Sequence, residues 1–205
     1  MKRMAIFLVS VSLAVLSAGT ASADTLESLS RRGDPTGYKH FLMGLERLKR
    51  GQLRFAIAEF QYCVRHAHLS GCGRVVDQSH FYSGVAYQRL GEDLKALREF
   101  QAAYTVNPGL FQAWFRAGKV HRGLGNLEQA LLHFQRVVAL KPDYGFGHYY
   151  LALTYYDRKD YAQAWKHARL AQRHGVKRTA LIEKLKRVSK EPSPAGAAEK
   201  AADRK

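Results

Sequence analysis

Two cysteines and two histidines that lie close together are the first residues whose chemistry must be considered. Cys63, His66, His68 and Cys72 belong to the residue types that bind zinc. However, His66 and His68 are two residues apart and point in different directions on a helix, and the spacing matches no zinc pattern. Cys63 and Cys72 therefore favour one disulfide in an oxidising compartment, with two free thiols or a metal site as alternatives.

No sequence motif typical of an enzyme is present. The chain has no phosphate-binding loop, no Gly-x-Ser-x-Gly, no His-Glu-x-x-His, no Cys-x-x-Cys-His haem motif and no carboxylate pair placed for acid–base catalysis. We therefore expect a protein that is not an enzyme and that needs no cofactor. An enzyme or a metal carrier is the least favoured interpretation.

The composition is that of a globular protein with a strong positive charge. The chain has 205 residues, 46% of them hydrophobic and 24% charged, which excludes wholesale disorder. The 33 Lys and Arg residues exceed the 17 Asp and Glu residues, so the net charge is +16. In a cytosolic protein, this charge would suggest a nucleic acid partner.

The amino terminus predicts export instead. Residues 1–23 begin with Lys2 and Arg3, continue with an apolar stretch of about twelve residues and end with the small residues Ala21-Ser22-Ala23, as in a cleavable signal peptide. An uncleaved anchor is the alternative, but a spanning helix needs about 20 apolar residues. No cysteine follows at the cleavage point, so the chain is not expected to be a lipoprotein.

Cleavage would remove the two basic residues of the signal and leave a charge of +14. We expect a periplasmic protein of a bacterial envelope. Such a protein rarely meets DNA or RNA, so no nucleic acid partner is expected.

A repeat of 34 residues organises most of the remaining chain. The preceding copy lies 40 residues earlier, because six additional residues fall near Gly71-Cys72-Gly73. The two central copies pair Gly84 with Gly118, Tyr87 with His121, Gly91 with Gly125, Ala96 with Ala130, Phe100 with Phe134, Ala103 with Val137 and Pro108 with Pro142. The outer copies contain Gly44, Gly51, Ala56 and Phe60 before them and Ala152, Tyr155, Ala164 and Ala171 after them.

This pattern resembles the tetratricopeptide repeat. The family's aromatic, Gly, Tyr, Gly, Ala, Phe, Ala and Pro positions are matched by Trp114-x3-Gly118, Tyr87, Gly125, Ala130, Phe134, Ala103 and Pro142. The resemblance implies an all-α fold, a right-handed superhelix of helix-turn-helix units. The expected segments are a signal peptide (1–23), a linker (24–36), four repeats (37–70, 77–110, 111–144 and 145–178) within 37–178, a loop insertion (71–76), a capping helix (179–190) and a disordered tail (191–205).

Residue size supports these assignments. Small residues such as Gly84 and Gly118 would let the first helix of a unit approach the second closely, while Phe100 and Phe134 would fill the space between units. The fourth unit departs most, because Lys159 stands at the position of the turn glycine.

Three histidines occupy the same place in units one, two and four. His40, His80 and His148 correspond to Trp114 of unit three. Equivalent residues of adjacent units lie roughly 10 Å apart, too far to share a metal ion. We interpret these histidines as half-buried packing residues and expect no metal site.

The resemblance also indicates a binding surface. In tetratricopeptide arrays the first helices line a concave face, and the lysine and asparagine clamp that some members use for carboxy-terminal peptides is missing here. The expected groove residues are instead aromatic or basic: Phe41, Phe81, Phe115, Tyr149, Gln88, Arg89, Lys119, Arg122 and Tyr156. Such rings can anchor a peptide, or they can pack between neighbouring repeats.

A second candidate surface lies near the carboxyl end. Residues 166–190 carry +8 through Lys166, Arg169, Arg173, Lys177, Arg178, Lys184, Lys186, Arg187 and Lys190 against Glu183. This density would attract an acidic protein segment or an anionic envelope surface, or it serves solubility alone.

The sequence thus predicts a non-enzymatic scaffold of the bacterial envelope that binds a protein or peptide partner, which is expected to be acidic. The alternative is a structural protein that self-associates, or that docks on an anionic membrane or polymer through its basic end.

Overall fold

The computed structural model describes residues 36–67, 75–177 and 180–189. In these ranges all regular structure is helical, as predicted. The helices are α2 (Thr36–Lys49), α3 (Leu53–Arg65), α4 (Val76–Arg89), α5 (Asp93–Val106), α6 (Phe111–Gly123), α7 (Leu127–Leu140), α8 (Gly145–Asp157), α9 (Tyr161–Arg173) and α10 (Ala180–Val188). The predicted signal peptide (1–23), tail (191–205) and most of the insertion lie outside the described residues.

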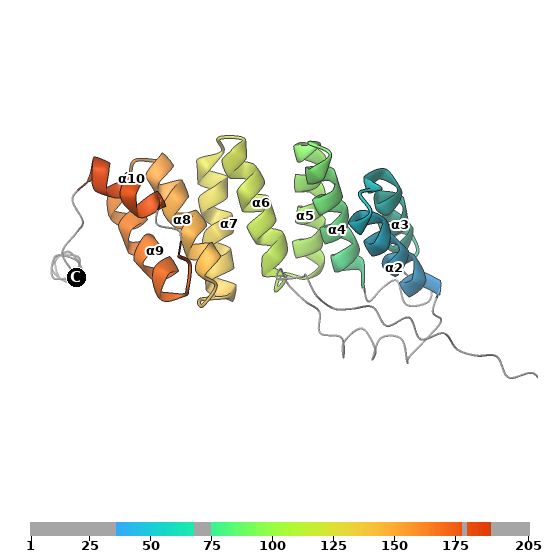
Figure 1. Cartoon of the computed structure of the whole chain (residues 1–205). Coiled ribbons are helices and arrows are strands. Elements are labelled where there is room, and N and C mark those ends of the chain that lie inside the picture. Colours follow the sequence, from blue (N-terminus) through green and yellow to red (C-terminus); the bar gives the residue numbers. More distant parts are fainter. Residues whose placement is uncertain (1–35, 68–74, 178–179, 190–205) are drawn as a thin grey trace, which may run out of the picture. The chain divides into compact units, whose positions relative to one another are not determined.

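The described helices form consecutive antiparallel pairs (Figure 1). α2 packs on α3, α4 on α5, α6 on α7 and α8 on α9, and the second helix of each pair also packs on the first helix of the next. This is the helical repeat architecture expected from the sequence. Among the described helices, none has the length and apolar character needed to cross a membrane.

The turn inside each pair requires a left-handed residue. Gly51, Gly91 and Gly125 take φ values of 74°, 75° and 78°, which glycine adopts without steric penalty. Lys159 takes the same conformation in the fourth pair, with φ 64°. The turn geometry is therefore kept although the glycine is lost, and Asp160 caps the next helix by accepting a hydrogen bond from the Gln163 backbone N–H at 3.2 Å.

Within each of the first three pairs, a glycine of the first helix lies against a phenylalanine ring of the second. A Cβ atom on Gly84 would lie 2.6 Å from the Phe100 ring, and a Cβ atom on Gly118 would lie 2.8 Å from Phe134. In the fourth pair, Ala152 and Ala168 occupy these places and both are buried. The small–large combination is thus exchanged for two small residues.

The same phenylalanine rings also join neighbouring pairs. The Phe60 centroid lies 5.8 Å from that of Tyr82 on α4, and Phe134 lies 5.5 Å from Tyr150 on α8. Phe60 and Phe134 therefore stabilise their own pair and the next one, as expected for positions that fill the space between units.

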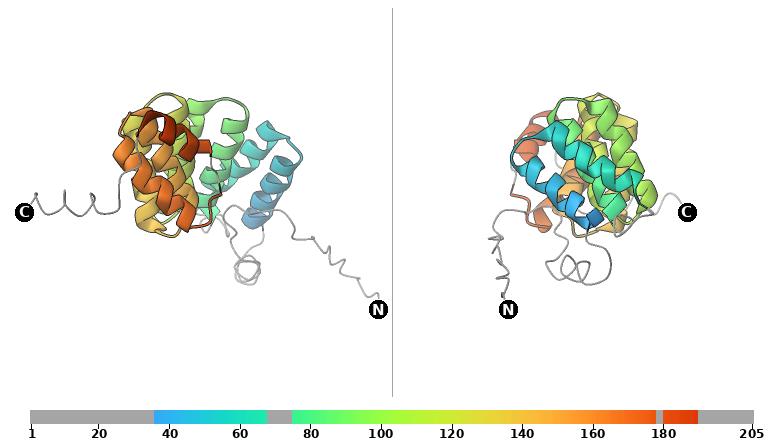
Figure 2. Two further views of the ribbon diagram at one scale, coloured as in Figure 1. Left: turned by 60° about the vertical axis from the view of Figure 1, so that its left-hand side comes forward. Right: turned by 90° about the vertical axis from the view of Figure 1, so that its right-hand side faces the viewer.

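α10 covers the outer side of the last pair (Figure 2). Leu181 and Leu185 are buried against Trp165 and Ala168 of α9. The Trp165 indole N–H donates a hydrogen bond to Ser189 Oγ at 3.0 Å, so the indole is satisfied although it is buried.

The glycine–phenylalanine contact yields a stability prediction. Gly84→Ala should lower the free energy of unfolding by about 1–3 kcal/mol, because the Phe100 ring must move, and this outweighs the gain of about 1 kcal/mol in helix propensity. Gly123→Ala is the control, since a Cβ there meets nothing within 4 Å, and it should be neutral or stabilising. Urea denaturation of both variants measures the difference, and equal stability would contradict the packing role.

Candidate functional site

The first helices form one continuous side of the array. α2 contacts α4, and α6 contacts α8. Side chains continue this layer: Arg116 Nη1 of α6 donates a hydrogen bond to Gln88 Oε1 of α4 at 3.3 Å, and the Phe115 and Tyr150 centroids lie 5.1 Å apart between α6 and α8. We call this side, formed by α2, α4, α6 and α8, the first-helix face.

The first residue of the predicted aromatic stripe is a packing residue. Phe41 is only 1% exposed, and its ring packs against Phe60 and Tyr82, with centroids 5.9 Å apart in both cases. In this conformation Phe41 cannot contact a partner. The prediction that it lines a groove is therefore wrong, and its role is to pack between the first two helix pairs.

The other three rings of the stripe are half-buried. Phe81 packs on Phe100 and Phe115 on Phe134, with centroids about 6 Å apart, as in common aromatic pairs. Tyr149 is half-buried on α8. These rings contribute to packing and keep part of their surface accessible.

A pair of arginines distinguishes the middle of the first-helix face. Burial, together with the positive charge of Arg89, lowers the pKa of Arg116. Arg89 donates a hydrogen bond through Nη1 to the Leu48 carbonyl at 3.1 Å. Among the described residues, no carboxylate forms an ion pair with either guanidinium.

Aromatic side chains surround these cations. Lys119 Nζ lies 5.3 Å from the Tyr150 ring centroid, a cation–π contact. Tyr144 and Tyr150 are close enough to Arg116 to interact with its charge, and burial raises the pKa of Tyr144. The result is a positive region in which Arg116 and Lys119 are half-buried beside aromatic rings and Arg89 is exposed, with no carboxylate ion pair to either arginine in the described part of the chain.

The remaining predicted residues of this side lie at its α8 end. Arg122 forms an ion pair with Asp157 of α8, with an Nη2–Oδ2 distance of 2.8 Å. Tyr156 packs against Tyr161 at 5.8 Å. Arg122 is thus neutralised within the array, in contrast to Arg89 and Arg116.

Sequence reasoning missed Arg116, Tyr144 and Tyr150. Arg116 lies three residues before Lys119, so both project from the same side of α6. Tyr150 holds the equivalent sixth position of the fourth unit. A search at positions six and nine together would have found Arg116 and Tyr150, but not Tyr144, which is the last residue of unit three.

The predicted basic surface is largely solvent-exposed. Arg169 is half-buried, and Arg178 and Lys190 lie outside the described residues or side chains. The exposed members are Lys166, Arg173, Lys177, Lys184, Lys186 and Arg187. Lys186 contacts Glu183 at 3.2 Å. A solvated helix surface accounts for this exposure, because charged side chains keep their hydration there.

The residues first considered for metal binding do not come together in the described structure. Cys63 is buried on α3, whereas His68 and Cys72 lie outside the described residues, so the disulfide stays a prediction. His66 Nδ1 donates to the Tyr62 carbonyl at 2.9 Å. Among the described residues, no three His, Cys, Asp or Glu side chains are placed to hold one metal ion.

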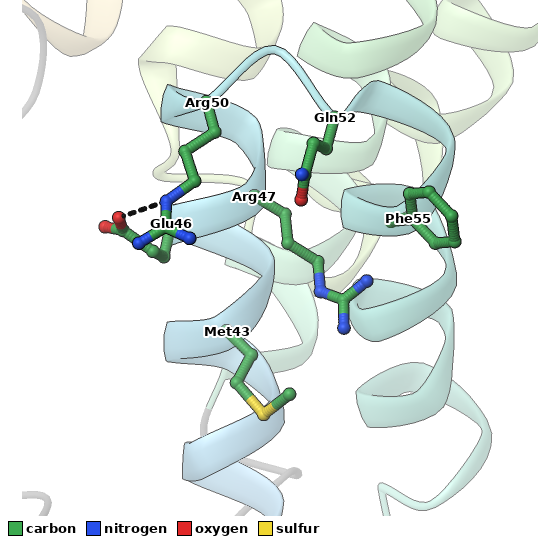
Figure 3. A pocket seen from close by; sticks show the side chains of 6 residues that line it. All are labelled: Met43, Glu46, Arg47, Arg50, Gln52 and Phe55. Atoms are coloured by element: carbon green, nitrogen blue, oxygen red, sulfur yellow. Dashed lines mark hydrogen bonds and ion pairs between the residues drawn. The ribbon is translucent and has the colours of Figure 1, made fainter.

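A shallow depression lies on the first pair, at one end of the array. Figure 3 shows Met43, Glu46, Arg47, Arg50 and Phe55 around it. Glu46 pairs with Arg50 at 2.9 Å, and the Arg47 guanidinium lies over the Phe55 ring.

Later repeats explain why this depression is open. The residues equivalent to Met43 and Glu46 are small or apolar and are buried by the preceding second helix: Ser83, Ala86, Ala117, Val120, Leu151 and Thr154. In the first pair, the charged Glu46 suits contact with water. The depression is therefore a solvated end.

The arginine pair yields a second stability prediction. Arg116→Met should leave the free energy of unfolding within about 1 kcal/mol of the parent, or raise it, because it removes a desolvated cation that has no counter-ion. Arg122→Met is the matched control and should lower it by about 0.5–1 kcal/mol through loss of the Asp157 ion pair. A larger loss for Arg116→Met than for Arg122→Met in urea denaturation would show that Arg116 is retained for stability.

Comparisons with known proteins agree with this architecture. A sequence model described as "Tetratricopeptide repeat" matches residues 111–144, the bounds expected for the third unit. Superkiller protein 3 of Saccharomyces cerevisiae is 25% identical over 81 residues, which cover 40% of this chain and 6% of that protein. The chain therefore spans only a small part of the length of this curated relative.

Solved structures show the same fold. A MamA structure (residues 41 to the end) from Desulfovibrio magneticus RS-1 superposes with a TM-score of 0.64 at 20% identity, covering 74% of this chain and 82% of that one. YrrB, described as a TPR protein with an unusual peptide-binding site, has a TM-score of 0.59 at 18% identity, covering 73% and 74%. The family match over residues 111–144 and the repeated helix pairs together show that the chain contains a tetratricopeptide repeat and has the fold of tetratricopeptide repeat proteins.

Proposed function

We propose that the chain is a non-enzymatic scaffold that holds an acidic segment of a partner protein on its first-helix face. The observation that carries this proposal is the half-buried Arg116 beside Arg89, without a carboxylate partner in the described part of the chain. A partly desolvated cation beside a second positive charge destabilises a fold unless an anion offsets it, so a partner carboxylate at Arg116 would supply the missing charge. A peptide-binding site in one fold neighbour, YrrB, supports the binding mode.

The aromatic rings would supply affinity beside this charge. Phe81, Phe115 and Tyr149 are half-buried, and Phe146 on the same layer is 40% exposed. Rings of this kind contribute large contact area at low entropic penalty. An extended or helical segment with apolar and acidic residues fits such a surface better than a purely polar one.

We further propose that the partner is a component of the bacterial envelope, on the basis of the signal-like residues 1–23. Amino-terminal sequencing of the protein recovered from the periplasm should give Asp24 as the first residue. Retention in the cytoplasm with residues 1–23 intact would contradict this assignment.

Peptide binding tests the proposed face directly. Twelve-residue peptides with a constant Leu and Phe content and zero to four Glu residues should bind more tightly as Glu is added, measured by fluorescence anisotropy. Arg89→Gln with Arg116→Gln should weaken binding at least about tenfold and reduce its salt dependence.

The control for this experiment removes equal charge from second helices. Arg98→Gln with Arg136→Gln changes α5 and α7 and should leave affinity within about twofold of the parent. If instead only neutralisation of Lys184, Lys186 and Arg187 abolishes binding, the partner docks through the basic end, and the proposal is wrong.

A further inference from the structure

One contact recurs in every helix pair, between residues 19 positions apart. In the first two pairs it joins a histidine to a carboxylate: His40 Nδ1 lies 2.7 Å from Glu59 Oε2, and His80 Nδ1 lies 2.7 Å from Glu99 Oε2. The third pair has Trp114 beside His133, with ring centroids 5.5 Å apart.

The fourth pair replaces the carboxylate with a second imidazole. His148 Nδ1 lies 3.1 Å from His167 Nδ1, a hydrogen-bond distance between two nitrogens. A hydrogen bond between these two nitrogens needs one donor and one acceptor. One Nδ1 must therefore carry a hydrogen and the other must not.

A neighbouring carbonyl decides which nitrogen donates. His148 Nε2 lies 3.0 Å from the Pro142 carbonyl oxygen, which can only accept. His148 therefore carries its proton on Nε2, and its Nδ1 accepts from His167 Nδ1–H. His167 Nε2 is then the ring nitrogen of the pair that is left to take up an additional proton.

The surroundings of this nitrogen oppose a positive charge. Burial is the main cause that lowers the pKa of His167 to about 4, and His148 and Lys166 lower it further. His148 is itself buried, and its pKa is lowered by burial and by His174, whose ring centroid lies 5.6 Å away.

The other groups that reach the pair carry no negative charge. The Tyr155 ring stacks on His167 with centroids 5.7 Å apart, and the Pro142 carbonyl of the α7–α8 turn lies 3.0 Å from His148 Nε2. The groups named above that shift the pKa of His148 and His167 include no carboxylate among the described residues. A proton on the pair thus has no carboxylate to offset it, unlike a proton on His40 or His80.

We propose that His148 and His167 form an acid-sensitive latch that holds α8 on α9 at neutral pH and releases the fourth helix pair in acid. The first two pairs, which have a carboxylate at the equivalent position, stay closed under the same conditions. The latch is independent of partner binding and needs no ligand.

The direction of the pH effect follows from proton binding. Between pH 6.5, the ordinary value for histidine, and about pH 4, the unfolded state binds a proton that the folded state does not. The stability of the fourth pair therefore falls as the pH falls through this range. For His167 alone, the unfolding equilibrium constant should rise on the order of 30-fold between pH 7.5 and pH 5.

Tryptophan fluorescence gives a local measurement. The chain has two tryptophans, and Trp114→Phe leaves Trp165 on α9, which is 1% exposed and should shift to red emission when the fourth pair opens. In this background, the urea midpoint at Trp165 should fall steeply from pH 7.5 to pH 5. His66→Gln, a change on the first pair, should leave this pH dependence unaltered.

Two replacements of His167 decide the proposal. His167→Gln can still donate to His148 Nδ1 but does not titrate. The acid-induced rise in the unfolding equilibrium constant should therefore be smaller in this variant, by the roughly 30-fold factor expected for His167. His167→Glu recreates the His–Glu contact of the first two pairs and should remove or reverse the loss. If the parent and His167→Gln lose stability in parallel between pH 7.5 and pH 5, the proposed latch is wrong. It is also wrong if long-range ¹⁵N–¹H spectra find His148 protonated on Nδ1.

Discussion

The contact between a small residue of each first helix and a side chain of the second helix constrains the whole array. Where the first helix has glycine, the second has phenylalanine, and where the first has Ala152, the second has Ala168. Because the first helix always has a small residue at this position, the two helices keep a close approach in every pair. The same phenylalanines reach the next pair, so one set of contacts fixes both the hairpin and its stacking.

This constraint also determines which residues are left for recognition. The sides of the first helices that meet second helices are occupied by packing, and their residues at those positions are small or apolar. The first-helix face keeps side chains with unused charge capacity. Arg116 and Arg89 are the clearest examples, since Arg122 is neutralised by Asp157 whereas they have no such carboxylate in the described structure. The basic end near α10 is exposed and stays a second candidate surface.

The repeat could be predicted because its signals are local. Glycine at a left-handed turn and a residue pair 16 positions apart are visible in the sequence, and even Lys159 keeps the turn of the glycine it replaces. The burial of Phe41 was not visible, since it depends on Tyr82 of the next pair. Arg116 was missed for a related reason, because its isolation from carboxylates is a property of three neighbouring helices and not of its own segment.

The central claim is that the arginines of the first-helix face receive the carboxylates of a partner. Titrating a Glu-containing peptide into ¹⁵N-labelled protein, while observing the arginine Nε–Hε signals, tests it most directly. Arg116 and Arg89 should shift first and saturate together with the peptide, while Arg98 on α5 stays unchanged. Shifts confined to Arg173 and Arg187 near the basic end, with Arg116 and Arg89 unmoved, would contradict the account.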